Sequence, residues 1–457
     1  MRSTDVNPVL ATKYNTPVPR YTSYPTIPYW DDQIAITAWE DIFSKRFHEQ
    51  NHVNGLSLYL HLPFCESLCT YCGCNKKITT NHQVEDEYIA VIEKEWRLYK
   101  AIMREAPVIR ELHIGGGTPT FFPPHKLEKL LNYIFKGSIV HPRREFSIEG
   151  HPNNTTVAHL EKLSALGFKR ISYGVQDNDP VVQQVINRIQ PFENVRQVTE
   201  NARTAGYTSV NFDLIYGLPL QTVQSMERTI HQVLELMPDR IAFYSYAHVP
   251  WTSKAQRLFD ESHLPDAATK LQLYLTGKQL LLQHGYYDIG MDHFALPHDD
   301  LYKAKTAGTL HRNFMGYTTQ NTGLLLGLGV SAISDAQYGY VQNDKTLHNY
   351  YASILSGKPA IQRGILLTVE DISFRAYIQD ISCRSKTTFQ PQHLPLLRQY
   401  VFPLLQDMAT DGLINWNEQE LSLTQQGQFF IRHVCSAFDV RMHKDDPPTK
   451  NLFSKGI

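Results

Sequence analysis

Four of the six cysteines of this 457-residue chain lie within ten residues, in the segment Cys65–Cys74. Cys65, Cys69 and Cys72 have the spacing C-x3-C-x2-C, so one short loop can offer three soft sulfur ligands. Neighbouring thiolates repel one another unless a metal neutralises them. Three cysteine ligands leave one iron of a [4Fe–4S] cube without a protein ligand, and an open position is typical of a catalytic metal. The spacing therefore predicts an iron–sulfur cluster with an open iron.

Other interpretations of these cysteines stay open. A zinc site usually joins two separated CxxC or CxxH pairs, whereas Cys383 and Cys435 are isolated in the sequence. A disulfide framework is not expected in so long a chain with so few cysteines. Cys74 is either a fourth ligand or a thiol outside the ligand set. If it were a ligand, the open iron would be lost.

Composition bounds the possible partners and the location. The chain has 44 Lys and Arg against 45 Asp and Glu, so no basic field favours a nucleic acid partner. No segment approaches eighteen consecutive apolar residues, and Met1–Asp5 lack an apolar signal region, so no membrane association is expected. Because a cluster needs reduced thiols, a cytoplasmic location is expected. The 25 tyrosines and 21 phenylalanines suit a core and would also suit a pocket for a flat macrocycle.

From residue 56 to about residue 246, predicted strands alternate with amphipathic helices. The predicted strands are Leu56–Leu62, Glu111–Ile114, Glu145–Glu149, Arg170–Gly174, Val210–Leu214 and Ile241–Ser245. The predicted helices are Val84–Arg104, Pro124–Phe135, Thr155–Leu166, Asn194–Ala205 and Thr222–Leu236. Helical crossovers imply a parallel sheet with right-handed connections. Six units are fewer than the eight of a full barrel, so periodicity alone fits both a partial barrel and a doubly wound sheet.

The remaining sequence divides the chain into three predicted parts. Residues 1–54 form a proline-rich arm followed by a helix near Ile34–Gln50. Residues 55–358 form the catalytic domain, which ends with a helix over Asp266–His284 and irregular sequence from Gly285 to about Gly357. Residues 359–457 form a mostly helical, winged-helix-like unit. Because this unit lacks a basic recognition helix, it is expected to pack against the barrel rather than to bind DNA.

The winged-helix-like pattern consists of helix, strand, strand and helix. These elements are predicted at Leu404–Asp411, Gly412–Ile414, Leu421–Thr424 and Gly427–Phe438.

Polar residues and glycines end several of the predicted parallel strands. Functional groups of parallel barrels come from the loops at the carboxyl ends of the strands. Gly115–Gly117 ends the second strand, where glycines let the backbone approach a ligand and expose N–H groups to an anion. Glu149, Gln176, Asp213 and Ala247 end or follow other strands. Such residues are usually structural when taken singly, whereas their shared rim indicates a ligand site.

These motifs resemble those of the radical S-adenosylmethionine (SAM) enzymes, whose signature is CxxxCxxC with an aromatic residue, here Tyr71, before the third cysteine. The extension CxxxCxYCGC, followed by Asn75-Lys76, resembles the oxygen-independent coproporphyrinogen III oxidase (coproporphyrinogen dehydrogenase) family. Further segments that support this resemblance are Arg20–Thr26, Gly290–Ala295, and His311–Phe314 with Gly316–Thr319. The similarity runs from about residue 14 to the C-terminus.

The resemblance implies an α/β fold with a partial (β/α)6 TIM-like radical SAM barrel, an N-terminal arm over the active site and a C-terminal mostly helical domain. It implies a [4Fe–4S] cluster on Cys65, Cys69 and Cys72, and two SAM molecules. Positions matching those around the SAM on the open iron are Tyr59, Gly116, Glu149 and Ile333, and those around the second SAM are Tyr71, Gly117, Thr118, Gln176, Arg188, Asp213 and Ala247. A guanidinium such as that of Arg188 can clamp a carboxylate. One departure is His151, where the family often has an acidic residue.

The implied reaction is the oxygen-independent oxidative decarboxylation of two propionate side chains of coproporphyrinogen III to vinyl groups. It gives protoporphyrinogen IX in haem biosynthesis through a 5′-deoxyadenosyl radical from SAM, and no side chain is assigned as an acid or base. The implied partners are coproporphyrinogen III and an unidentified electron donor and acceptor, and a monomer is expected. Because the substrate carries four carboxylates, cationic groups must line part of the pocket, and Arg20, His293 and Arg312 are candidates.

Two related functions remain as alternatives. A haem-binding chaperone shares the barrel and three cysteines, but such relatives typically lack the fourth cysteine, here Cys74. They also tend to lack the Arg20–Thr26 and Gly290–Ala295 segments. Haem-opening radical SAM enzymes share more of the barrel and are harder to distinguish.

Overall fold

The computed structural model of the protein describes residues 7–444 and residue 453. The expectation about the segment Met1–Asp5 therefore lies outside the described residues. In the described part of the chain, no helix combines the length and apolar character needed to span a bilayer.

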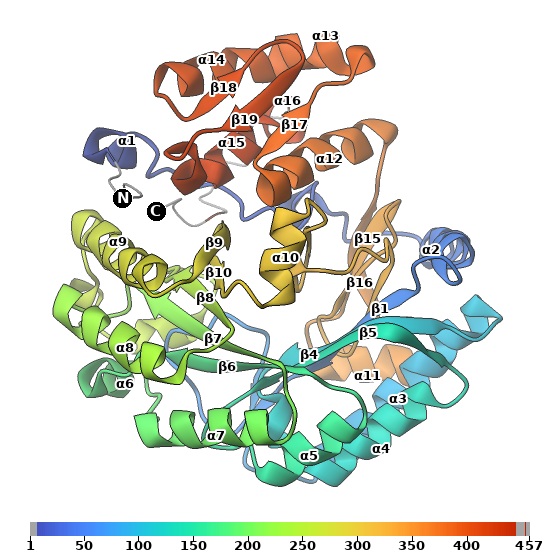
Figure 1. Ribbon diagram of the computed structural model, residues 1–457. Helices are drawn as coiled ribbons and strands as arrows, with labels where there is room; N and C mark the ends of the chain where they lie inside the picture. Colours follow the sequence, from blue (N-terminus) through green and yellow to red (C-terminus); the bar gives the residue numbers. More distant parts are fainter. Residues whose placement is uncertain (1–6, 445–452, 454–457) are drawn as a thin grey trace.

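Parallel strands form the centre of the molecule, as Figure 1 shows. They are β1 (Leu56–Leu62), β4 (Val108–Gly116), β5 (Ile139–Gly150), β6 (Arg170–Gln176), β7 (Ser209–Tyr216) and β8 (Arg240–Ser245). Each pairs in parallel with the next. Because all six run in one direction, their carboxyl ends share one rim. The predicted partial barrel is confirmed.

The strands are buried on both faces, as is typical of a parallel sheet covered by helices. In β1, the alternate residues Leu56, Leu58, Leu60 and Leu62 are fully buried in the main hydrophobic core. The other face of β1 carries Ser57, Tyr59 and His61, since side chains alternate along a strand. The apolar face thus packs on the helices and the polar face points into the barrel.

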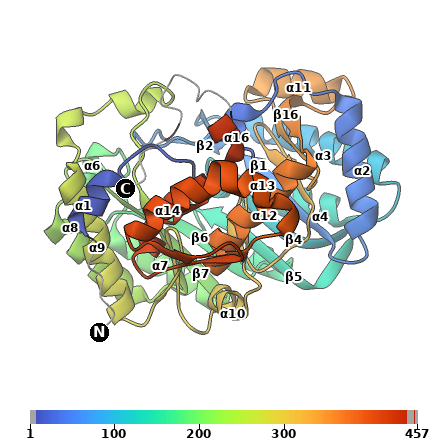
Figure 2. The ribbon, with the colours of Figure 1, turned by 90° about the horizontal axis from the view of Figure 1, so that it is seen from above.

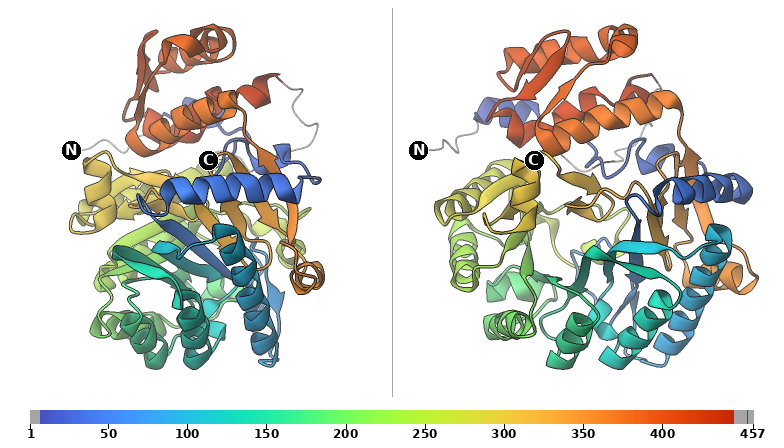
Figure 3. Two further views of the ribbon diagram at one scale, coloured as in Figure 1. Left: turned by 90° about the vertical axis from the view of Figure 1, so that its right-hand side faces the viewer. Right: turned by 45° about the vertical axis from the view of Figure 1, so that its right-hand side comes forward.

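Helices cover the outer face of the barrel (Figures 1 and 3). They are α3 (Val84–Met103), α4 (Pro124–Phe135), α5 (Val157–Ala165), α6 (Pro180–Val185), α7 (Phe192–Thr204), α8 (Val223–Leu236) and α9 (Ala267–Gln283). Local sequence fixes some of their starts: capping boxes at Thr156 and Thr222 begin α5 and α8. All the predicted barrel helices are present within a few residues of their expected bounds.

The prediction of irregular structure between Gly285 and Gly357 is wrong. This stretch contains β9 (Tyr287–Gly290), β10 (His293–Ala295), α10 (Asp300–Thr306), β11 (His311–Asn313), β12 (Gly316–Thr318), β13 (Leu325–Leu328), β14 (Ile333–Asp335), β15 (Gly339–Asn343) and α11 (Leu347–Leu355). Its strands have only three to five residues. Such short strands are set by pairing with neighbours and show little periodicity of their own.

These short strands extend the main sheet at both edges. β13 pairs in parallel with β1, and β14, β15 and β16 (Ile361–Leu366) continue from it in antiparallel pairs. At the other edge, β10 and β9 follow β8. The strand order β16-β15-β14-β13-β1-β4-β5-β6-β7-β8-β10-β9 is linear, so β16 and β9 remain separate edges of the described sheet. The hairpin of β11 and β12 pairs separately from this sheet.

The C-terminal unit lies beside the open side of the barrel (Figures 1 and 2). It contains α12 (Val369–Arg384), β17 (Lys386–Thr388), α13 (Leu394–Leu396), α14 (Phe402–Thr410), β18 (Ile414–Trp416), β19 (Glu420–Leu423), α15 (Ile431–Ala437) and α16 (Val440–Lys444). The predicted helix–strand–strand–helix pattern is present, with β17 as a third strand. Because β16 belongs to the barrel sheet, we place the boundary of this unit after residue 366 rather than residue 358.

The N-terminal arm joins the C-terminal unit to the barrel. The first segments of the chain are α1 (Pro8–Lys13) and α2 (Ile36–Gln50). Tyr21 and Tyr24 of the arm are buried in the hydrophobic core of the C-terminal unit. On the barrel side, Arg20 donates to Asp292 and to the backbone oxygen of Ser245 at the end of β8. The arm therefore lies along the seam between the two units.

Candidate active site

A cavity of about 680 Å³ lies at the carboxyl rim of the parallel strands. Cys65, Cys69 and Cys72 all line it. So do the predicted SAM-binding residues Tyr71, Gly116, Gly117, Thr118, Glu149, Gln176, Arg188 and Asp213. These residues come from the loop after β1, from the carboxyl-terminal halves of β4, β5, β6 and β7, and from the segments after β4 and β6, so the fold gathers them from five separate parts of the sequence.

The cysteine loop is held by its backbone. The short strands β2 (Phe64–Cys65) and β3 (Lys77–Ile78) pair in parallel and close its base. The backbone oxygen of Cys72 accepts hydrogen bonds from Lys76 Nζ at 3.1 Å and Ser253 Oγ at 3.0 Å. Thr70 is tied to α6 through its backbone N–H and its hydroxyl. The loop is thus fixed in place by contacts that leave the thiols facing the cavity.

Each of the three predicted ligand thiols has a polar neighbour. Thr118 Oγ1 lies 3.3 Å from Cys65 Sγ, and Arg188 Nη1 donates to Cys69 Sγ at 3.6 Å. A hydrogen bond from the Cys74 thiol lowers the pKa of Cys72, whereas burial raises the pKa of Cys65 to about 11. Hydrogen-bond donors such as Thr118, Arg188 and Cys74 stabilise the thiolate form of a neighbouring cysteine. The residues present therefore fit a cluster bound by three thiolates.

The described residues contain no group of three His, Cys, Asp or Glu side chains that converges closely enough to hold a single metal ion. A zinc ion would need its ligands to meet at one point, about 2.3 Å from each sulfur. A four-iron cluster instead takes each thiolate at a different corner.

Glu149 explains the glycines that end β4. Its Oε2 accepts from the backbone N–H of Gly116 at 3.2 Å, and its Oε1 lies 3.2 Å from His113 Nε2. A Cβ atom on Gly115 would lie 2.7 Å from Glu149 Oε1, and one on Gly117 would lie 2.5 Å from the backbone oxygen of Pro63. A side chain at Gly117 would clash with the backbone of the cysteine loop, whereas one at Gly115 would displace the Glu149 carboxylate from the position described here.

Arg188 and Asp213 place opposite charges on the wall of the cavity formed by the ends of β6 and β7. Arg188 Nη2 donates to the backbone oxygen of Gly174 at 2.6 Å, and its Nε has no hydrogen-bond partner among the residues described. Asp213 accepts from Ser172 Oγ at 2.9 Å and Asn211 Nδ2 at 2.8 Å. Burial, and then the negative charge of Glu149, raises the pKa of Asp213 to about 6. This wall offers both a guanidinium and a carboxyl group to a zwitterionic ligand.

Three predicted site residues flank the cavity instead of lining it. Tyr59 on β1 contacts His61 Nδ1 through its hydroxyl at 3.0 Å and stacks on His113. Ile333 lies on β14, two strands away from Tyr59. Its backbone is close to Gly327 of β13, and Gly327 is the residue that pairs with Tyr59 in the sheet. Ala247 follows β8, at the other side of the rim. Whether these three contact a cofactor stays a prediction.

Gln256 is a residue that the sequence analysis missed. It is buried, and its Nε2 donates to the backbone oxygens of Tyr71 at 2.9 Å and Ala247 at 3.1 Å. Its Oε1 accepts from Val249 N at 2.6 Å. One amide thus joins the cysteine loop to the loop after β8. No motif marks it, because its role depends on backbone groups far away in the sequence.

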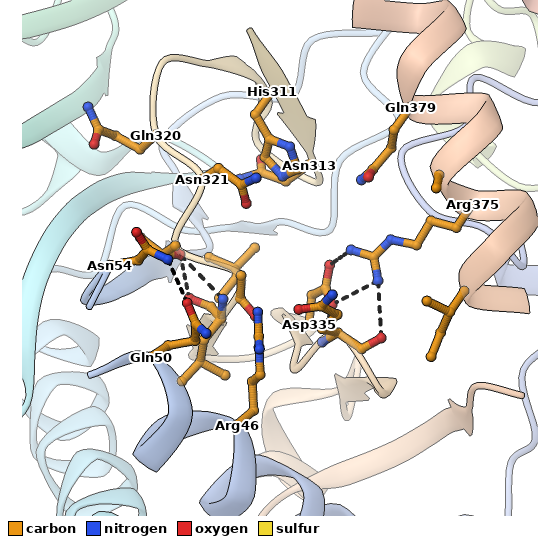
Figure 4. Close-up of a pocket in the computed structure, with 17 residues that line it drawn as sticks. Arg46, Gln50, Asn54, His311, Asn313, Gln320, Asn321, Asp335, Arg375 and Gln379 are labelled. Carbon is orange, nitrogen blue, oxygen red and sulfur yellow. Dashed lines mark hydrogen bonds and ion pairs between the residues drawn. The ribbon is translucent and has the colours of Figure 1, made fainter. Parts of the chain in front are cut away.

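A second cavity, of about 310 Å³, lies away from these residues (Figure 4). Seven of its seventeen lining residues are Asn or Gln, and two are arginines whose guanidinium groups are both engaged. Arg375 pairs with Asp335 at 2.6 Å, and Arg46 Nε donates to the backbone oxygen of Gly323 at 2.9 Å. None of the predicted site residues lines it. This cavity is therefore separate from the cysteine loop.

The class of protein follows from this site and from a family model. Residues 59–233 match the model described as the radical SAM superfamily. The match begins in β1 and contains the cysteine loop, the glycine run and the strand ends that carry Glu149, Gln176 and Asp213. The barrel is thus a radical SAM domain.

Relatives define the family within this class. The oxygen-independent coproporphyrinogen III oxidases of Salmonella typhimurium and Escherichia coli are 39% and 38% identical to this chain, over 95% of both chains in each pair. The solved structure of coproporphyrinogen III oxidase (HemN) from Escherichia coli, described as a radical SAM enzyme, has a TM-score of 0.89 at 37% identity and covers 95% of this chain and 99% of its own. The chain belongs to the oxygen-independent coproporphyrinogen III oxidase family.

Proposed function

We propose that this protein decarboxylates two propionate side chains of coproporphyrinogen III oxidatively, without oxygen, to give protoporphyrinogen IX. The proposal is supported above all by the cavity, which gathers the three cysteines of the C-x3-C-x2-C motif with Glu149, Arg188 and Asp213. The relatives named for this activity align over nearly the whole chain, including the arm and the C-terminal unit.

The cavity has room and ligands for the cofactors of the class. Cys65, Cys69 and Cys72 would hold the [4Fe–4S] cluster, and Cys74 would remain outside the ligand set as a donor to Cys72. The volume of about 680 Å³ lies within the usual range of ligand pockets. When bound, the cluster and SAM supply the radical that removes a hydrogen atom from the propionate.

The protein's own residues would bind SAM and orient it. Glu149 and Asp213 can accept hydrogen bonds from ammonium or ribose groups, and Arg188 can clamp the carboxylate of SAM. The glycine run exposes backbone N–H groups to the same ligand. The arm and the C-terminal unit would shield the reacting groups from water and oxygen.

The partners follow from the chemistry. Reduction of the cluster and removal of one electron per vinyl group require a separate electron donor and acceptor. Because the cluster needs reduced thiols, we place the protein in the cytoplasm. We expect it to act as a monomer.

Anaerobic turnover tests the proposal. Cluster-reconstituted protein is given dithionite, SAM and coproporphyrinogen III, with a clarified cell extract as the source of an electron acceptor. We expect protoporphyrinogen IX together with 5′-deoxyadenosine, both measured by chromatography, because each decarboxylation consumes one radical. A parallel reaction with haem in place of coproporphyrinogen III tests the haem-opening alternative.

Protein with a full iron content that forms neither product would contradict the proposal. Consumption of haem without formation of protoporphyrinogen IX would favour the haem-opening activity instead.

A further inference from the structure

Arg312 on β11 is a buried guanidinium without a counter-ion. It is 9% exposed, and no carboxylate among the described residues lies within ion-pair distance of it. Its Nη1 donates to the backbone oxygens of Arg20 at 2.7 Å and Tyr21 at 2.8 Å. Its Nε is buried and has no hydrogen-bond partner in the described structure. A buried charge without a partner is costly unless an anion joins it.

Other guanidinium groups surround the same place, and three of the carboxylates near them are already paired with these groups. Arg20 pairs with Asp292, Arg240 with Asp299 and Arg170 with Glu145. Burial and the positive charges of Arg312, Arg240, Arg20 and Arg170 lower the pKa of His293 to about 3. His293 is therefore neutral, and Arg312 has no direct ion pair among the described residues.

This region borders the candidate active site. A smaller cavity of about 110 Å³ lies inside the barrel and shares Glu149, Ser172, Asp213 and Tyr244 with the main cavity. His293, Arg240 and Tyr317 line its other side.

Ring contacts connect Arg312 to this inner cavity. Its guanidinium carbon lies 5.5 Å from the centre of the Tyr317 ring, and the His293 ring meets Tyr317 edge-on at 5.2 Å. His293 Nε2 lies 3.4 Å from the hydroxyl of Tyr244, whereas its Nδ1 has no partner in the described part of the chain. His293 thus lines the inner cavity with an unused donor, and Arg312 lies beside Tyr317, where it lines a small pocket together with Tyr21 and Tyr24 of the arm.

We infer that Arg312 and His293 form a subsite for one carboxylate of the substrate, and that a propionate of the tetrapyrrole that is not reacting is held there. The inference rests on the proposed function and specifies how that site recognises its substrate. A guanidinium provides a forked pair of donors for a carboxylate, and neutral His293 can donate from Nδ1 in the tautomer protonated there. Because Arg312 also binds the backbone of Arg20 and Tyr21, the subsite joins the arm to the substrate.

Porphyrin binding tests the subsite directly. The probes are coproporphyrin III, the oxidised form that is stable in air, and its tetramethyl ester, which lacks the carboxylates. Both are titrated by fluorescence against cluster-reconstituted protein. We expect the wild-type protein to prefer the carboxylate form by about tenfold or more, and R312Q to lose most of this preference. R312K should keep part of it, because it retains the charge but not the fork.

R46Q is the matched control. Arg46 also donates to a backbone oxygen, but it lies in the separate cavity of Figure 4. R46Q should bind both probes as the wild-type protein does. H293F retains the ring beside Tyr317 and should lower the preference for the carboxylate form, which gives a second test if R312Q unfolds at a lower temperature.

Kinetics separate this inference from the proposed function. R312Q should raise KM for coproporphyrinogen III while its iron content and its slow cleavage of SAM without substrate stay at the wild-type level. Unchanged carboxylate preference and unchanged KM in folded R312Q and H293F would overturn the subsite and leave the proposed function standing. Wild-type protein without turnover would contradict the proposed function, whatever the porphyrin titrations show.

Discussion

Replacing Cys72 with serine is expected to abolish cluster binding and, with it, all turnover. A serine hydroxyl is a poor ligand for the irons of the cluster, which prefer soft thiolates, and only two cysteines of the motif would remain. The substitution is small and polar, and the backbone of Cys72 stays held by Lys76 and Ser253. Iron and sulfide per chain, measured after anaerobic reconstitution, should fall from about four of each to a small fraction.

The matched variant is C74S. In the structure, Cys74 is a hydrogen-bond partner of Cys72, and a serine hydroxyl can replace its thiol as a donor. Its iron content should therefore remain close to the wild-type value. Equal loss of iron in C72S and C74S would mean that Cys74 is a ligand, and full iron in C72S would remove Cys72 from the ligand set.

Replacing Arg188 with alanine is expected to weaken SAM binding by about 100-fold, or roughly 3 kcal/mol, which is typical for loss of a charge-assisted bidentate contact in a cavity. Arg188 lies beside Cys69 and Gly174, with an unpartnered Nε in the described structure. Its removal takes away the main cation of that wall. Equilibrium dialysis of labelled SAM against reconstituted protein measures the change, with iron content determined on the same samples.

Two further variants make this result specific. R188K keeps a positive charge and should recover part of the affinity, although it lacks the planar fork. R228A removes an exposed arginine that pairs with Asp179, the N-cap residue of α6, and it should bind SAM normally. Unchanged SAM binding at every site in R188A, with the cluster intact, would reject the role assigned to Arg188.

The barrel could be predicted because its elements are long and regular. α4 has the predicted bounds Pro124–Phe135, and β1 has the predicted bounds Leu56–Leu62. Amphipathic helices of nine to twenty residues carry a clear period, and buried parallel strands are continuous apolar runs. The choice of a partial barrel over a doubly wound sheet came from the resemblance, since both give the same alternation.

The strands β13 to β16 were not predictable from local pattern. β14 has three residues, and only its pairing with β13 and β15 makes it a strand. Tertiary context decides such short elements, because the pairing partner and not the local sequence supplies the stabilisation. For the same reason, the predicted domain boundary after residue 358 separates β16 from the barrel sheet, although β16 pairs with β15 in that sheet.

The candidate site was predictable in part. The cysteine loop is local in sequence, so spacing alone indicated its chemistry. Arg188 and the other predicted SAM-binding residues were assigned by resemblance, and the structure brings most of them to one cavity. The sequence could not show that Arg312 lacks an ion-pair partner, because this depends on which carboxylates the fold places near it. Gln256 was missed for a similar reason.

Mössbauer spectroscopy of anaerobically reconstituted, iron-57-labelled protein tests whether the cluster has an open iron. We expect a [4Fe–4S] cluster in which one iron differs from the other three and changes its spectrum when SAM is added, because that iron has no protein ligand. A cluster whose four irons are all unaffected by SAM, or a protein that holds zinc in place of the cluster, would contradict the open iron.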